Sequence, residues 1–337
     1  MVMSEAAERV EQFRRNPRLD QLLENLASTL KSVERPPVEA GNWPMLFIVG
    51  APRTGSTYCL QWLAASGAFG YPSNFIARFW SAPFFGAMVQ EMLVNPEFDY
   101  RGEFSDVSPR IVTSTSDAGK TGGMLAPSEF WFFWREHLPT DGDLGINLSE
   151  AHEQDYRAFR YELAAFAEVC QKPLAMKGKI INHQISRFAA AVPEAMFLFM
   201  DRDPIDSAWS LLRSRRRIYG DERHWWSFKT PNYEVLKTLE PVEQVVGQVQ
   251  SIRRDVQVAL DQIPRERWIR LEYKKLCEDP SSAFQHIADW YKDNGSKLKG
   301  GNAMPIVTPA FAKVPSAERN RMERALKTFP ASVSSTV

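Results

Sequence analysis

The sequence lacks an excess of charge of either sign, because its 337 residues include 41 Lys and Arg and 41 Asp and Glu. With no net charge to attract a polyanion or an anionic membrane, nucleic acid is not expected as a partner. No apolar run approaches the roughly 18 residues that span a bilayer, and residues 1–15 lack the apolar core of a signal peptide. We therefore expect a cytoplasmic protein without a membrane span, and the oligomeric state stays open.

Cysteine is also scarce. The chain has only Cys59, Cys170 and Cys277, which are odd in number, far apart and without the spacing of metal ligands. This pattern is typical of reduced thiols in a cytoplasmic protein, and it predicts no structural metal.

The most informative segment present is MLFIVGAPRTGST at residues 45–57. An apolar run typical of a buried strand leads into a loop bounded by Gly50 and Gly55, at the point where a helix should begin. A helix start offers unpaired N–H groups and the positive end of the helix dipole, so this arrangement suits phosphate binding. The nucleotide-binding P-loop has the same glycine spacing but requires a lysine where Ser56 stands, and the nearest cation is Arg53.

Strand and helix patterns alternate along the rest of the chain. Strands are predicted at residues 45–49, 174–176, 195–200 and 268–273, and helices at 5–33, 56–66, 150–170, 204–217, 241–262, 281–291 and, weakly, 317–327. Residues 71–127 are rich in turn signals and are expected to be an irregular lid or insertion. The fold class is thus α/β, with three α/β/α layers around a mostly parallel sheet. We expect one domain over residues 1–337, with a helical extension at 1–40 and an irregular tail at 294–337.

A second candidate phosphate site follows the strand at 195–200. Arg202 stands at the end of that strand, and Ser210 lies on the helix that follows. Arg53 also follows a strand, and ligands of such sheets bind beyond the carboxyl ends of the strands. An arginine with a serine hydroxyl suits a phosphate separate from the one at the glycine loop. The charge run Arg215 to Arg217 is expected to be solvated.

Three ordered motifs resemble those of the sulfotransferase family. The loop PRTGST at residues 52–57 resembles the family's 5′-phosphosulfate loop, and the eight-residue step from Arg202 to Ser210 resembles its 3′-phosphate motif. Residues 271–280, LEYKKLCEDP, resemble a later motif whose tyrosine, here Tyr273, lies by the adenine. The resemblance extends over about residues 46–280.

The resemblance implies a P-loop-like sulfotransferase fold and a donor, 3′-phosphoadenosine 5′-phosphosulfate. Its sulfuryl group would pass to a hydroxyl or amine of a small, partly apolar acceptor, leaving adenosine 3′,5′-bisphosphate, without a metal. The implied donor-binding residues are Arg53, Thr54, Gly55, Ser56, Thr57, Arg202, Ser210 and Tyr273. Arg53, the loop amides and Lys177 would stabilise charge on the leaving phosphate.

The general base is not fixed by the sequence. Many family members carry a glutamate shortly after the first helix, where this chain has Asn74, which cannot act as a base. Others place a histidine just after a lysine, whereas His183 here is offset from Lys177 by a few residues. Glu129, beside aromatic residues, is the third possibility, and its pKa is expected to be raised. The base is therefore Glu129, His183 or neither.

Aromatic residues cluster at Phe130–Trp134 and recur at Phe75, Phe79, Trp80 and the pair Trp225 and Trp226. They form either the wall of the acceptor pocket or part of an ordinary core.

Two rival functions also stay open. A P-loop kinase or nucleotide hydrolase would use Asp201, after an apolar strand, to position Mg²⁺. A non-catalytic nucleotide-binding protein would fit the missing glutamate.

Overall fold

A parallel sheet lies at the centre of the structure, a computed structural model that describes residues 16–38, 43–98, 102, 116–117, 120–141, 145–300 and 313–328. Within these residues the main sheet has four strands, in the spatial order β6 (Leu174–Lys177), β1 (Met45–Val49), β7 (Ala195–Asp201) and β8 (Trp268–Glu272). All neighbouring strands run parallel. The predicted strands are confirmed, each to within one residue.

The two faces of the sheet build two separate cores. In β1, Met45, Phe47 and Val49 belong to one apolar cluster, whereas Leu46 and Ile48 belong to the other. This alternation follows from the period of two in a strand. Because both faces are covered, every residue of β1 is buried, as its continuous apolar sequence predicts.

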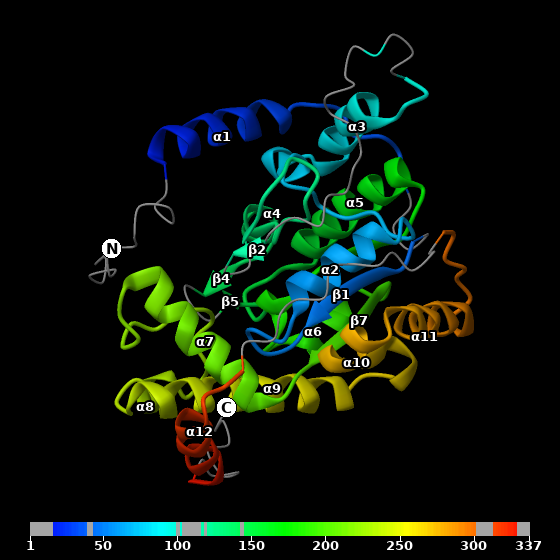
Figure 1. The fold of residues 1–337 in the computed structure, drawn as a ribbon. Coiled ribbons are helices and arrows are strands. Elements are labelled where there is room, and N and C mark those ends of the chain that lie inside the picture. Colours follow the sequence, from blue (N-terminus) through cyan, green and yellow to red (C-terminus); the bar gives the residue numbers. More distant parts are fainter. Residues whose placement is uncertain are drawn as a thin grey trace.

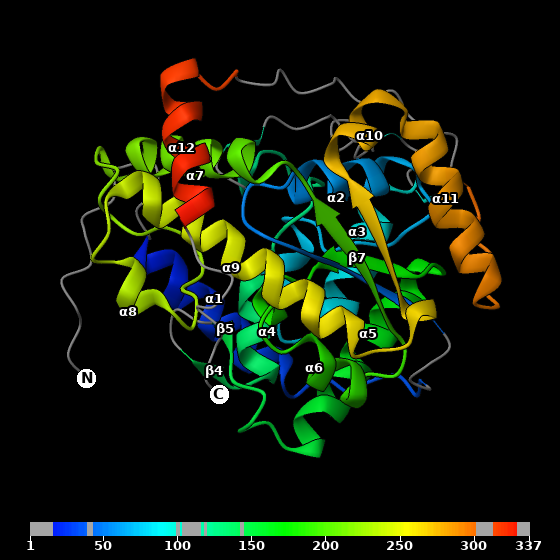
Figure 2. The ribbon, with the colours of Figure 1, turned by 90° about the horizontal axis from the view of Figure 1, so that it is seen from below.

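Helices cover both faces of the sheet (Figure 1). On one face lie α2 (Ser56–Ala65), α10 (Tyr273–Glu278) and α11 (Pro280–Asp293). On the other lie α5 (Glu153–Cys170), α6 (Ile185–Ala191), α7 (Pro204–Tyr219) and α9 (Pro241–Asp261). Figure 2 shows α9 on one side of β7 and β8, with α10 and α11 on the other. The predicted three-layer α/β/α architecture is therefore confirmed.

Shorter elements complete the described chain. These are α1 (Pro17–Leu30), α3 (Pro83–Val94), α4 (Trp131–His137), α8 (Tyr233–Leu236), α12 (Ser316–Thr328), the 3₁₀ helices η2 (Ile76–Phe79), η4 (Lys179–Ile181) and η5 (Arg265–Arg267), and two hairpins, β2 (Ser116–Asp117) with β3 (Lys120–Thr121) and β4 (Thr140–Asp141) with β5 (Gly145–Ile146).

One expectation is corrected, and another is confirmed. The segment at 71–127 is not irregular throughout, because Pro83 begins α3, which packs on α5. The tail at 294–337 contains α12, which confirms the weakly predicted helix. The predicted helix at 5–33 is present as α1, and its residues 5–15 lie outside the described residues, as do 99–101, 103–115 and 118–119 of the expected lid.

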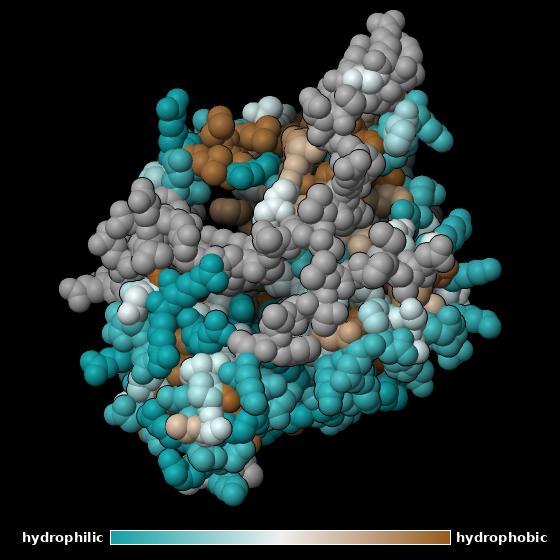
Figure 3. Space-filling view, in the orientation of Figure 1, coloured by the Kyte–Doolittle hydropathy of each residue, from teal (hydrophilic) through white to brown (hydrophobic). Residues whose placement is uncertain are grey.

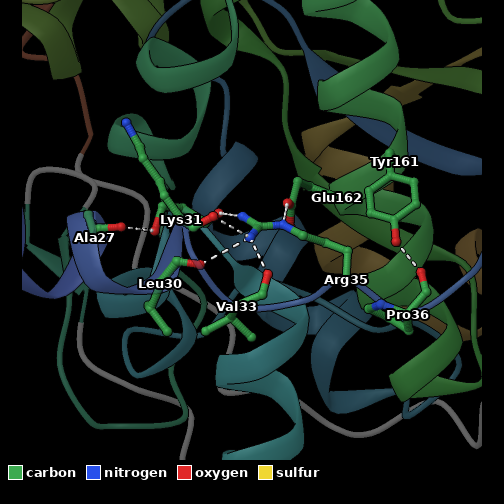
Figure 4. Close-up of polar contacts among 9 residues, drawn as sticks. Ala27, Leu30, Lys31, Val33, Arg35, Pro36, Tyr161 and Glu162 are labelled. Atoms are coloured by element: carbon green, nitrogen blue, oxygen red, sulfur yellow. Dashed lines mark hydrogen bonds and ion pairs between the residues drawn. The ribbon is translucent and has the colours of Figure 1, made fainter.

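Arg35 attaches α1 to the body of the protein (Figure 4). Its Nη1 donates to the carbonyl oxygens of Leu30 and Val33 at 3.1 and 2.7 Å, so it caps the end of α1. Its Nε donates to Glu162 of α5 at 3.0 Å. Burial raises the pKa of Glu162, and Arg35 counteracts part of that rise. A single arginine thus caps a helix end and pairs with one oxygen of a buried carboxylate.

Candidate functional site

The loop between β1 and α2 lies at the carboxyl end of the sheet. Its two glycines have positive φ, 132° at Gly50 and 89° at Gly55. A Cβ on Gly50 would lie 2.5 Å from the carbonyl oxygen of Met200, and one on Gly55 would lie 2.2 Å from the ring of Tyr273. Both positions therefore need glycine, because any side chain would collide with β7 or with Tyr273.

Asn182 ties the start of this loop to the segment that follows β6. The side chain is 1% exposed, and its Oδ1 accepts a hydrogen bond from the Gly50 N–H at 3.1 Å. Its Nδ2 donates to the Gly50 carbonyl at 2.9 Å. The Gly178 N–H also donates to the Ile48 carbonyl at 2.9 Å. The chain is therefore attached to β1 and the glycine loop both before Lys179, through Gly178, and after it, through Asn182.

Helix α2 begins at the end of the loop without a capping side chain, since its N-cap residue is Gly55. Thr54 and Ser56 are buried beside it, and the Thr54 hydroxyl donates to the Ala51 carbonyl at 3.0 Å. The first-turn N–H groups of α2 and the positive end of its dipole thus meet at the loop. This is the local arrangement that binds a phosphate group.

The structure brings the two phosphate motifs of the sequence together. Arg53 Nε donates to the Ser210 hydroxyl at 3.0 Å, and Arg202 Nη1 donates to the Arg53 carbonyl at 3.2 Å. The Arg202 guanidinium also lies 5.0 Å from the centre of the Tyr273 ring. Residues from three strand ends and from α7 therefore meet at one edge of the sheet, as the parallel topology requires.

Lys177 is bonded to two other predicted site residues. Its Nζ donates to the Thr57 hydroxyl at 2.7 Å and to Glu129 Oε1 at 2.9 Å. The second carboxylate oxygen of Glu129 accepts a hydrogen bond from Trp131 Nε1 at 2.7 Å. The Lys177 side chain is 5% exposed and that of Glu129 is 29% exposed, so the pair stands at the border between core and solvent.

The expected rise in the pKa of Glu129 is wrong. Burial alone would raise the pKa of this carboxyl, but the charge and hydrogen bond of Lys177, together with the Trp131 donor, lower it further than burial raises it. Glu129 is therefore ionised at neutral pH. The sequence placed it correctly beside aromatic residues, but the partner that controls its charge comes from β6, 48 positions along the chain.

A family model described as "Sulfotransferase family" matches residues 44–292. The chain belongs to the sulfotransferase family. The matched region contains the glycine loop, the Arg202 to Ser210 step and Tyr273, so the motifs that suggested the resemblance lie within it.

Solved sulfotransferase structures are similar only at a distance. Sulfotransferase STF9 from Mycobacterium avium is 16% identical, with 93% of this chain and 73% of that chain covered and a TM-score of 0.48. Sulfotransferase STF1 from Mycobacterium tuberculosis H37Rv is 15% identical, with 94% and 77% covered and a TM-score of 0.47. A sulfotransferase from Alicyclobacillus acidocaldarius is 16% identical, with 84% and 91% covered and a TM-score of 0.41. No curated protein matches the sequence.

Asp201 occupies the position that a P-loop kinase would use for Mg²⁺. Arg253 donates to both of its carboxylate oxygens at 2.8 and 3.0 Å, and Arg270 pairs with it as well. Burial would raise its pKa, but the two arginines hold the pKa below its usual value. In the described part of this sulfotransferase, no group of three His, Cys, Asp or Glu could hold a metal ion, and no helix is long and apolar enough to cross a membrane.

The structure separates the three positions considered for the general base. Glu129 lies with Lys177, whereas His183 Nδ1 lies 3.1 Å from the Asp255 carboxylate of α9. Asn74 has a structural role, because its Nδ2 donates to the carbonyl oxygens of Thr121 and Gly123, both at 2.9 Å. An amide with two carbonyl acceptors holds these segments together, which a glutamate at this position could not do.

Lys179 is a site residue that the sequence reasoning missed. Its Nζ donates to the Ala51 carbonyl at 3.0 Å, so the amine reaches into the glycine loop. Burial, followed by the charges of Lys177 and Arg53, lowers its pKa to about 7, although Glu129 acts in the opposite direction. The only signal in the sequence was its position two residues after Lys177.

The aromatic block divides between core and surface. Phe130, Phe133 and Trp134 are buried in the main core, whereas Phe132 is 41% exposed and stacks on Trp80. Trp131 is partly buried and lies 5.4 Å from Phe228, measured between ring centroids. Core packing thus explains three of the five aromatic residues in the block, and Trp131 is the one that is bonded to Glu129.

A buried arginine supports the segment that carries Phe228. Contrary to expectation, Arg215 of the charge run is fully buried, and its guanidinium donates to the side-chain oxygens of Gln244 and Gln248 at 2.7 and 3.0 Å. Gln248 in turn donates to the carbonyls of Trp226 and Phe228 at 3.0 and 2.8 Å. The Trp226 ring lies 5.8 Å from the Arg53 guanidinium. Burial lowers the pKa of Arg215 to about 10.

Proposed function

We propose that this sulfotransferase moves a sulfuryl group from 3′-phosphoadenosine 5′-phosphosulfate to a hydroxyl or amine of a small, partly apolar acceptor. The observation that carries the proposal is the meeting of Arg53, Arg202 and Ser210 at one sheet edge. Two arginines from different strand ends suit two phosphates on one nucleotide better than the linear triphosphate of a kinase substrate.

The glycine loop would hold the 5′ phosphosulfate, with the amides of residues 54–57 and the Arg53 guanidinium around it. Arg202 and Ser210 would hold the 3′ phosphate. Tyr273 would lie by the adenine, which is supported by its ring against Gly55 and beneath Arg202. The loop amides and the two guanidinium groups are held in place before negative charge develops on the leaving phosphate. This is the condition for effective electrostatic stabilisation of the transition state.

Glu129 is the proposed general base, since it is ionised and is bonded to Trp131, a partly buried residue of the aromatic block. It would take the proton from the acceptor oxygen or nitrogen as that atom bonds to sulfur and the bond from sulfur to the phosphate oxygen breaks. Protonation of Glu129 would remove the negative partner of Lys177. The Lys177 charge would then act on the leaving phosphate. Proton transfer to Glu129 would thus favour the departure of the phosphate.

The surface gives the acceptor its expected character. Figure 3 shows apolar surface gathered over the part of the molecule that holds α1 and α3 in Figure 1, while the part with α7 and α8 is mainly hydrophilic. The exposed apolar side chains of α1 and α3 include Leu22, Met88 and Met92. An acceptor with an apolar portion would find contacts on this side.

Nucleotide binding tests the donor half of the proposal. Adenosine 3′,5′-bisphosphate should raise the melting temperature more than AMP does, because only the bisphosphate meets Arg202 and Ser210. Arg202→Met and Ser210→Ala should each weaken bisphosphate binding by about 10- to 100-fold, the value of a hydrogen bond to a charged group. Arg187→Met, an exposed arginine of α6, is the matched control. Equal shifts from both nucleotides would overturn the assignment.

Turnover tests the base. With an acceptor found by screening phenols, alcohols and amines, Glu129→Gln should reduce the rate of bisphosphate formation at least about 100-fold. Donor affinity should be retained, since Lys177 then lacks its anionic partner and attracts the donor at least as well. Glu278→Gln, at an exposed glutamate of α10, should behave as the wild type. Unchanged turnover in Glu129→Gln would transfer the role to His183 or to another group.

A further inference from the structure

Lys179 has a fixed place next to the glycine loop. The preceding residue, Gly178, donates its N–H to a carbonyl of β1. Three residues after Lys179, the Asn182 side chain is hydrogen-bonded to Gly50. The amine therefore reaches the Ala51 carbonyl from a rigid segment rather than from a freely moving loop. Its position is built into the fold in the same way as that of Arg53.

The charges around Lys179 are unbalanced. The groups that act on its amine are Lys177 from the end of β6, Arg53 from the glycine loop and Glu129 from the segment before α4. The one carboxylate among them is already bonded to Lys177 at 2.9 Å and to Trp131. The hydrogen-bond partner of Lys179 is a neutral carbonyl. The cluster thus carries more positive than negative charge.

A partly buried cation among unbalanced charges responds by losing its proton. Desolvation and the neighbouring cations lower the pKa of Lys179 to about 7, so the amine is partly neutral at physiological pH. An anion that enters the loop supplies the negative charge that the protein itself does not. Coulombic attraction at such short range and in a partly dry site raises the proton affinity of the amine again.

We propose that Lys179 takes up a proton when the phosphosulfate end of the donor enters the loop, and thereby becomes the third cation that grips it. The inference rests on the proposed donor. Donor binding is then coupled to pH: it is strongest where the amine is already charged, and it weakens as the pH rises through neutrality. Arg53 does not share this coupling, because a guanidinium keeps its proton at any pH that the protein meets. Lys177 differs from Lys179 in that its amine is bonded to a carboxylate, that of Glu129.

Proton uptake can be measured directly. The donor, without acceptor, is titrated into the protein by calorimetry in two buffers of different ionisation enthalpy. If the donor raises the pKa of the amine well above 9, simple titration gives an uptake of about 0.9 proton at pH 8 and about 0.1 at pH 6. Lys179→Arg keeps the charge but cannot lose it, so its uptake at pH 8 should fall by about 0.9 proton relative to the wild type. Protons that the donor itself exchanges contribute equally to both proteins, so they cancel in the difference between the two uptakes.

Lys292→Arg, at an exposed lysine of α11, is the matched control and should show the wild-type uptake. Donor binding in which the wild type and Lys179→Arg take up the same number of protons at pH 8 would overturn the inference while leaving the proposed donor intact. Failure of the wild type to bind the donor at all would overturn both.

Affinity gives a second measurement that needs no variant. Between pH 7 and 9 the dissociation constant of the wild type should rise by up to about tenfold per pH unit. A flat profile over this range refutes the inference even if Lys179→Arg does not fold. A flat profile together with turnover that rises through pH 7 would instead mark Lys179 as a neutral amine that accepts the acceptor proton.

Discussion

The double hydrogen bond between Asn182 and Gly50 offers a sharp test of how the loop is held. Asn182→Ala removes a donor and an acceptor at a site that is almost closed to solvent, and it leaves both backbone groups of Gly50 without these partners. At about 0.5–1.5 kcal/mol for each net hydrogen bond, the free energy of unfolding should fall by about 1–3 kcal/mol.

Asn182→Asp changes only one atom, yet it should cost more at high pH. The carboxylate keeps the acceptor for the Gly50 N–H but places a negative oxygen against the Gly50 carbonyl, where the amide donated at 2.9 Å. A buried charge without a good partner costs about 3–5 kcal/mol. The protonated acid can donate to the carbonyl, so the folded-state pKa lies above the unfolded value near 3.9, and stability falls as the pH rises between the two.

Urea unfolding at pH 5 and pH 8 tests whether the Asn182–Gly50 hydrogen bonds stabilise the fold. Asn182→Asp should be less stable than Asn182→Ala at pH 8 and should recover part of the difference at pH 5. The control is Asn147→Asp, whose amide makes its hydrogen bonds at the surface and whose substitution should change stability by less than about 0.5 kcal/mol. If both Asn182 variants unfold like the wild type, the pairing with Gly50 does not hold the loop.

Two further predictions concern the same loop. Gly55→Ala should weaken the binding of adenosine 3′,5′-bisphosphate by at least about tenfold, as measured by calorimetry. The added Cβ would collide with Tyr273, and residue 55 needs a positive φ. Wild-type affinity in this variant would show that the loop can move aside. Lys179→Met should raise the free energy of unfolding by roughly 2–4 kcal/mol at pH 6.5, since the wild type must bury a charge there. This gain should shrink toward pH 9, because above pH 7 the folded wild type has lost a proton that its unfolded chain keeps up to about pH 10.5, so the wild type gains stability over that range. A gain independent of pH would contradict the burial argument.

The sequence predicted those features that depend on local pattern and on parallel topology. The apolar run at β1, the glycine loop and the start of α2 follow from neighbouring residues alone. That Arg53 and Arg202 share one edge follows from their positions after two parallel strands. The hydrogen bond from Arg53 to Ser210 depends in addition on the helix spacing of α7.

Other features depend on partners that are distant in the sequence. Arg215 was expected in solvent because it stands in a run of arginines, but Gln244 and Gln248 of α9 supply its oxygen partners inside the core. The charge state of Glu129 depends on Lys177, and that of Lys179 depends on burial that no local pattern shows. Helix α3 was missed because its phenylalanines, glycine and initial proline occur in a region dense with turn signals.

Helix α7 has a consequence for how this enzyme could be altered. It presents Ser210 to Arg53, and further along it buries Arg215, which through Gln248 holds Trp226 and Phe228. A loop graft that replaces residues 225–228 would remove the Trp226 ring beside Arg53, and a graft with a different backbone course would also displace the two carbonyls that accept from Gln248. The smallest exchangeable cassette therefore includes α7, this loop and the facing part of α9, and swapping the loop alone should damage the donor side as well.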